Sequence, residues 1–276
     1  MAVSIFKSPL AAGVLWLALS FGSAFPTQAE VVNTLENRQV EIAYLRPKSE
    51  ALQPVYDDLV RRGVLEELRN FLAPLRLPRP IKVQTEECGG ETQHYAPGGA
   101  ATVCYELAAK IAAIAAQHAD ADSPDYRNAV TGTFINAMLH EVSLAIFDVL
   151  QIPIWGKEED AADRLTAFIM LQFGEDVADV TISGTANFFA WSNLTWSGRD
   201  FETAGSPEAQ RYYNFLCIAY GGDPHVFGDL VDKGILPKHR AGRCTGEYEQ
   251  VRKAFNMRIM PYVDPDLLVR AKASRW

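Results

Sequence analysis

The feature that most constrains this chain is a long apolar segment, residues 126–150, which is hydrophobic on nearly every side of a helix. A helix that lacks a polar face is buried in a protein core or in a membrane. The segment nevertheless contains three titratable side chains, His140, Glu141 and Asp148. Burying such groups is costly unless they are paired or bind a metal. We therefore expect a central buried helix whose polar residues have partners elsewhere in the fold.

His140 and Glu141 begin the pattern HExxH, in which two histidines one helical turn apart bind zinc and the glutamate is the general base. The position of the second histidine holds Leu144, which has no lone pair to give to a metal. Glu159 and Asp163, four residues apart on the next predicted helix, share one face of it. We expect Glu159 to face a metal and Asp163 to accept a hydrogen bond from the His140 ring. These residues give two metal ligands, whereas a catalytic zinc normally has three.

Each of these residues also has a purely structural interpretation. His140 and Asp163 are then a buried pair kept for stability, which the leucine at position 144 favours. Glu141 is then a buried acid whose pKa is raised, or a partner for a nearby backbone group. Glu159, in the first turn of its helix, then only stabilises the helix dipole.

A replacement for the missing ligand is not evident nearby. Asp148 lies on the same helix face as His140, but about 12 Å further along, too far to share one metal. The remaining histidines are His94, His118, His225 and His239. We expect them to be ordinary surface residues, with His94 and His225 the most mobile candidates for a ligand.

The four cysteines, Cys88, Cys104, Cys217 and Cys244, include no CxxC pair. Their even number favours disulfides over a metal site in an exported chain. Of the three pairings that four cysteines allow, we expect the sequential one, Cys88 with Cys104 and Cys217 with Cys244.

The N-terminus predicts export. Residues 1–29 combine Lys7, an apolar stretch over residues 10–25 and small residues before position 30, as in a secretory signal peptide. An uncleaved anchor helix is the alternative, but the stretch is short for a bilayer. We expect cleavage after Ala29, a mature domain over residues 30–276 without a membrane span, and a periplasmic or extracellular location.

The remaining pattern predicts a mostly helical α+β fold with a small antiparallel sheet. Strands are expected at residues 39–44 and 81–86, and residues 92–95 and 101–105 form a hairpin pinned by Cys88 and Cys104. One helix is expected over residues 50–72, and others over 107–118, 158–173, 175–190, 207–219 and 247–257. Acidic residues outnumber basic ones 34 to 26, a net charge of -8, so nucleic acid is excluded as a partner class.

Several short segments together carry a family resemblance. They are VLEEL (64–68), LPRP (77–80), ECG (87–89), VCYEL (103–107), HE (140–141), GKEEDAAD (156–163) and QRYYNFLC (210–217) with YG (220–221). With these segments the chain resembles, over nearly all of its mature length, a family of secreted bacterial proteins described as putative metallopeptidases. The resemblance implies a zincin-like fold, with a metal-bearing helix under a small sheet and a peptide hydrolase site between them. The family's HExGHA reads HEVSLA here, so both the second histidine and the preceding glycine are replaced.

Three functions follow as expectations. The first is a member of that family with a degenerate zinc site and little or no peptide hydrolysis, which binds a peptide or protein by pairing it with a hairpin strand. The alternative is an active zinc metallopeptidase that uses His140, Glu159 and an unidentified third ligand, with Glu141 as the general base. The third is a purely structural envelope protein.

Overall fold

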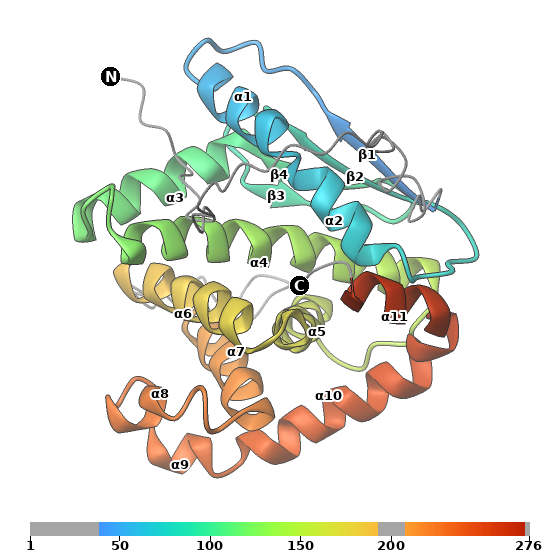
Figure 1. The fold of residues 1–276 in the computed structure, drawn as a ribbon, viewed down its shortest axis with the longest axis vertical. Helices are drawn as coiled ribbons and strands as arrows, with labels where there is room; N and C mark the ends of the chain where they lie inside the picture. Colours follow the sequence, from blue (N-terminus) through green and yellow to red (C-terminus); the bar gives the residue numbers. More distant parts are fainter. Residues whose placement is uncertain (1–38, 193–207, 274–276) are drawn as a thin grey trace, which may run out of the picture.

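The computed structural model describes residues 39–192 and 208–273. The predicted signal peptide, residues 1–29, lies outside the described residues, so it stays a prediction, as does the boundary of the mature domain. The described part is mostly helical with one small sheet, which confirms the α+β class. Figure 1 shows the sheet on one side of a long central helix, and further helices on its other side.

Four strands form the sheet in the order β1-β2-β4-β3. Their bounds are Val40–Tyr44 (β1), Ile81–Glu86 (β2), Gln93–His94 (β3) and Ala100–Cys104 (β4). The predicted hairpin is β3–β4, the antiparallel pair. The pairs β1–β2 and β2–β4 are parallel, so the sheet is mixed and the expected antiparallel arrangement holds for the hairpin alone. Parallel pairing of β1 with β2 requires a crossover, which the two helices between them supply.

The helices follow in chain order. Their bounds are α1 (Gln53–Arg62), α2 (Val64–Leu72), α3 (Tyr105–His118), α4 (Pro124–Val149), α5 (Glu158–Met170), α6 (Glu175–Trp191), α7 (Glu208–Gly222), α8 (Asp229–Asp232), α9 (Lys238–Ala241), α10 (Cys244–Arg258) and α11 (Pro265–Ala273). The single helix expected over residues 50–72 is wrong, because Gly63 has φ 62° and separates α1 from α2. A left-handed residue ends a helix, and glycine adopts that conformation at least cost.

Helix α4 is the predicted central helix. Ser123 accepts a hydrogen bond from the Tyr126 N–H at 3.2 Å, and Pro124 occupies the first turn, two features typical of a helix start. Among the residues described, only α4 is long and apolar enough to cross a membrane, and 83% of its most apolar window is buried inside the fold. Its composition is therefore explained by its place between the sheet and helices α5, α6 and α7 (Figure 1).

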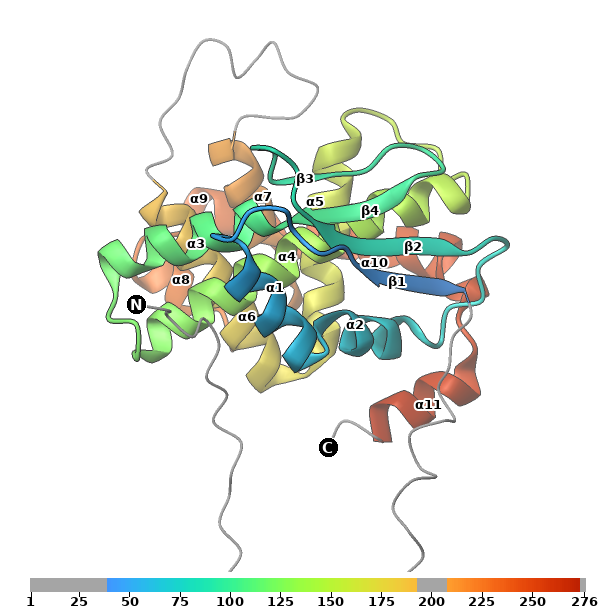
Figure 2. The ribbon, with the colours of Figure 1, turned by 90° about the horizontal axis from the view of Figure 1, so that it is seen from above.

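Close backbone contacts and disulfides hold the helices together. A methyl group on Gly132 would collide with the Thr181 carbonyl, and one on Gly184 with the Asn128 carbonyl, so α4 and α6 meet at two glycines. Both predicted disulfides are confirmed: Cys217 is bonded to Cys244, which joins α7 to α10, and Cys88 is bonded to Cys104 at the base of the hairpin. Helix α2 packs beside β1 at one end of the strand order, and β3 is the edge strand at the other end (Figure 2).

Candidate functional site

His140 lies on α4 with only 2% of its surface exposed, and two carboxylates from α5 face its ring. Its Nδ1 is 2.8 Å from Asp163 Oδ1, and its Nε2 is 2.8 Å from Glu159 Oε2. The structure thus brings together the three residues that the sequence placed in one site. Helix α5 achieves this because residues four apart lie on the same helix face.

Asp163 is held by a second partner that the sequence analysis missed. Arg211 on α7 donates from Nε to Asp163 Oδ2 at 2.5 Å and from Nη2 to Asp163 Oδ1 at 2.8 Å. Such two-point pairing of a guanidinium with a carboxylate is strong and directional. Burial raises the pKa of Asp163, but Arg211 and His140 outweigh it and lower that pKa to about 2.

The surroundings of the His140 ring favour its protonated form. Each ring nitrogen faces a carboxylate oxygen, and only the imidazolium donates from both nitrogens. Burial lowers the pKa of His140, yet the hydrogen bonds with Asp163 and Glu159 prevail and raise it to about 9. The hydrogen bond from His140 lowers the pKa of Glu159. We call His140, Arg211, Glu159 and Asp163 the His140 network; with the ring protonated, these four side chains carry no net charge.

Glu141, the expected general base, lies next to this network and is 2% exposed. Its Oε1 accepts a hydrogen bond from Gln93 Nε2 of β3 at 2.8 Å, and its Oε2 is buried with no hydrogen-bond partner among the described residues. Burial raises the pKa of this carboxyl group. Gln93 is a second residue that the sequence analysis missed, and it ties the edge strand to α4.

Among the described residues at this site, His140 and Glu159 are the two side chains placed to bind a zinc ion. Leu144 occupies the second histidine position and is 6% exposed, so its side chain fills the core. Two atoms that bind one tetrahedral zinc at about 2.0 Å lie roughly 3.3 Å apart. His140 Nε2 and Glu159 Oε2 lie at a hydrogen-bond distance of 2.8 Å, and a zinc ligand must be a neutral ring. Within the described residues, these two donors are one fewer than the three that a catalytic zinc normally has.

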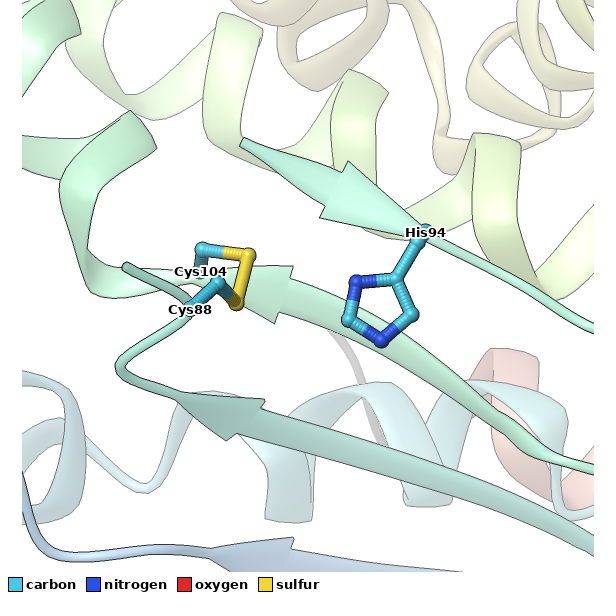
Figure 3. A group of neighbouring side chains, drawn as sticks. All are labelled: Cys88, His94 and Cys104. Carbon is cyan, nitrogen blue, oxygen red and sulfur yellow. A yellow bond between two sulfur atoms is a disulfide. The ribbon is translucent and has the colours of Figure 1, made fainter. Parts of the chain in front are cut away.

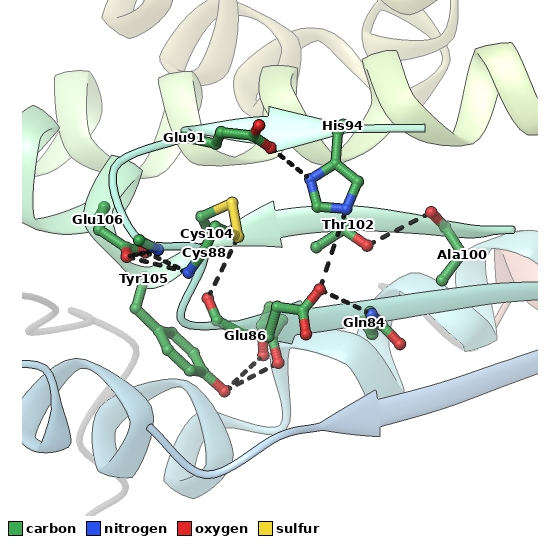
Figure 4. The surroundings of a disulfide bond; sticks show 12 residues. Gln84, Glu86, Cys88, Glu91, His94, Ala100, Thr102, Cys104, Tyr105 and Glu106 are labelled. Carbon is green, nitrogen blue, oxygen red and sulfur yellow. Dashed lines mark hydrogen bonds and ion pairs between the residues drawn. A yellow bond between two sulfur atoms is a disulfide. The ribbon is translucent and has the colours of Figure 1, made fainter. Parts of the chain in front are cut away.

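One other group of metal-binding residue types is found within the described residues, on the sheet: Cys88, His94 and Cys104 (Figure 3). The two cysteines are joined in a disulfide, so neither sulfur is the thiolate that zinc requires. His94 lies near two carboxylates, with Nδ1 3.3 Å from Glu91 and Nε2 4.0 Å from Glu86 (Figure 4). This group is therefore a disulfide beside a surface ion pair.

Asp148, which is too far along α4 to share a metal with His140, has a role of its own. Its Oδ2 accepts hydrogen bonds from Tyr95 Oη at 2.7 Å, the Gly98 N–H at 3.0 Å and Arg79 Nη2 at 2.6 Å. Tyr95 and Gly98 belong to the turn between β3 and β4. The hairpin is therefore attached to α4 at two places, through Glu141 and through Asp148.

The other histidines do not complete the site. His118 stacks on Trp191 with ring centroids 5.4 Å apart. Within the part of the chain that the structure describes, no group of three or more metal-binding side chains includes His118, His225 or His239.

Comparison with known proteins gives one match. The profile of a family described as "Putative metallopeptidase" matches residues 44–258, which include α4, α5 and the segment of α7 that carries Arg211. A family of this kind points to zinc as the metal. No curated protein and no solved structure matches the chain.

Proposed function

The chain belongs over residues 44–258 to the family described as "Putative metallopeptidase", and on that premise we propose that it is an exported member with little or no peptide hydrolysis, in which the His140 network occupies the place of the zinc site. The observation that carries the proposal is the pair of contacts on one ring. Both nitrogens of His140 are held at 2.8 Å by carboxylates, and the residue one turn on is Leu144.

Charge balance supports this assignment. The two carboxylates, Asp163 and Glu159, are matched by the His140 imidazolium and the Arg211 guanidinium, so the charges of these four groups balance without a metal. A zinc ion on a neutral ring would leave the same residues with one excess positive charge.

Export to the periplasm or the exterior is the second part of the proposal. The two disulfides indicate an oxidising compartment. The signal-like N-terminus of the sequence points in the same direction.

The retained activity that we propose is binding of an extended peptide or protein segment along β3. This strand pairs with β4 on one side and is the edge of the sheet. The backbone groups on the other side of an edge strand are free to pair with an added strand. A segment bound there would run beside Gln93, which is hydrogen-bonded to Glu141.

An active zinc peptidase is the second candidate, and one observation favours it. Glu141 Oε2 is buried without a hydrogen-bond partner among the described residues. A general base needs an oxygen that is free to accept a proton from the attacking water. In this alternative, His140, Glu159 and a third ligand would hold zinc, which would activate a water molecule, and Glu141 would be the general base.

Elemental analysis of the mature chain, purified without a metal-affinity tag, separates the two candidates. We expect the natural protein to hold far less than one zinc per chain and Leu144→His to hold close to one. Leu144→Gln is the matched control, because it adds a polar side chain that is a poor zinc ligand. The double variant Leu144→His/His140→Ala locates any gained zinc at this site.

Stoichiometric zinc in the natural protein would contradict the proposal and favour the enzyme. In that case, peptide cleavage should be abolished by a chelator and by Glu141→Gln. Zinc-free samples of both the natural protein and Leu144→His would show that the donors of α4 and α5 do not form a zincin site at all.

A further inference from the structure

A groove of about 810 Å³ lies on the opposite side of α5 from His140. Ala161 and Leu165 line it, whereas Glu159 and Asp163 face the histidine. Residues two apart on a helix point in different directions, so the groove and the His140 network are separate surfaces. Its other walls are α10 and residues 147–155, which end α4 and lead into α5.

The floor of the groove is apolar, and its rim exposes large hydrophobic side chains. The apolar lining includes Phe147, Ile152, Ile154, Val251 and Phe255. Trp155 is 97% exposed and Met257 is 60% exposed, so neither is used to hold the fold together. Exposed tryptophan and methionine beside an apolar floor are typical of protein-binding surfaces.

The groove is also cationic in a chain whose net charge is -8. Four basic residues line it: Arg164, Arg243, Lys253 and Arg258. Within the described residues, none of the four takes part in an ion pair. Among the described residues, Arg164 Nε is buried without a hydrogen-bond partner. The one carboxylate in the lining, Glu247, is already paired through both oxygens with Arg240 at 2.7 and 2.8 Å.

The spacing of the cations indicates the shape of the partner. Arg243 precedes α10 and Arg258 is its last residue, so about 22 Å of helix separates them. A single anionic headgroup cannot reach across that distance, whereas an extended peptide of about seven residues spans it.

We propose that this groove binds an acidic peptide segment of a partner protein, with one apolar side chain on the apolar floor and carboxylates along α10. Trp155 packs on the apolar side chain of the peptide. The surface is independent of the proposed peptide binding at β3, because it shares no residue with that edge.

The test is a selection from a random dodecapeptide phage library against the intact mature protein. Enriched peptides are then labelled with fluorescein and their binding is followed by fluorescence anisotropy. We expect peptides that carry an aromatic or aliphatic residue flanked by Asp and Glu. Their affinity should fall at least about tenfold in Lys253→Glu/Arg258→Glu and also fall in Trp155→Ala.

The matched control is Lys48→Glu/Lys110→Glu, which makes the same change in net charge at two exposed lysines outside the groove. This control should bind the selected peptides as the natural protein does. Circular dichroism of each variant verifies its fold.

Three outcomes would overturn the proposal. The first is a selection that yields no peptide able to distinguish the natural protein from the groove variant. The second is that oleate binds in the groove while the selection yields no peptide, which would assign the groove to a lipid. The third is concentration-dependent dimerisation that Trp155→Ala abolishes, which would assign it to a second copy of the chain.

Discussion

The His140 network predicts that the free energy of unfolding falls as the pH rises above neutrality. In the folded protein, burial opposes the charge of His140, but its hydrogen bonds to Asp163 and Glu159 raise the pKa to about 9 from an ordinary value of 6.5. A raised pKa means that the protonated ring is bound more tightly in the folded state. The stabilisation is therefore fully present below pH 6.5 and is lost as the pH rises through 9.

The size of the effect follows from the two pKa values. Each unit of difference corresponds to about 1.4 kcal/mol, so the whole effect is about 3 kcal/mol. Between the two values the folded chain holds one more proton than the unfolded chain, and the free energy of unfolding falls by about 1.4 kcal/mol per pH unit. Asp163 does not contribute there, because its lowered pKa gives stability that is present above pH 3.8 and lost as the pH falls through about 2.

Urea unfolding from about pH 6 to pH 9.5, with a chelator present, measures this slope. All four cysteines are in disulfides, so no thiol titrates in that window. The control is His140→Gln, whose side chain does not titrate, and the difference between the two profiles isolates the ring. Parallel profiles would refute the reasoning. If the variant does not fold, the ring carbon shifts of the natural protein, followed by NMR, report the pKa of His140 directly, and a value near 6.5 would refute it equally.

Three further changes test the packing around the site and the helices. Arg211→Met should lower the free energy of unfolding at neutral pH by about 3 kcal/mol, because it leaves the buried Asp163 carboxylate without its guanidinium partner. Urea unfolding measures this loss. Gln151→Gly should raise the free energy of unfolding by about 0.5–1 kcal/mol, because Gln151 has φ 51° at the end of α4 and glycine adopts a positive φ at less cost. An unchanged urea midpoint would contradict this expectation. Gly184→Ala should lower the thermal midpoint and reduce the free energy of unfolding by about 2 kcal/mol or more, because the added methyl group meets the Asn128 carbonyl. A midpoint equal to that of the natural protein would show that α4 and α6 separate easily.

The parts of the site that the sequence predicts are those that depend on local periodicity. Glu159 and Asp163 share a helix face by their spacing alone, and a histidine inside an apolar helix requires polar partners. Arg211 could not be assigned from its spacing, since 48 residues separate it from Asp163 and only the packing of α7 on α5 brings them together. A buried Asp163 bound to a histidine nevertheless implies an additional cation, and that implication was available from the sequence.

Two errors in the fold have similar causes. The apolar stripe over residues 50–72 continues in phase across Gly63, so periodicity predicted one helix where the left-handed glycine separates two. Strand patterns indicate which residues pair with a sheet but not the direction of the strand. The parallel pairing of β2 with β4 therefore could not be read from alternation.

The two attachments of the hairpin to α4 have a consequence for the way the protein opens. Glu141 and Asp148 lie two helical turns apart and contact opposite ends of β3, through Gln93 and through the turn at Gly98. The hairpin and the helix are thus expected to behave as one cooperative unit in amide hydrogen exchange, with the Gly98 and β4 amides exchanging together with those of the second half of α4. The distance between β3 and α4 would then be fixed in the folded protein. A segment that binds beside β3 would have to fit that fixed distance, because the hairpin would not move to accommodate it.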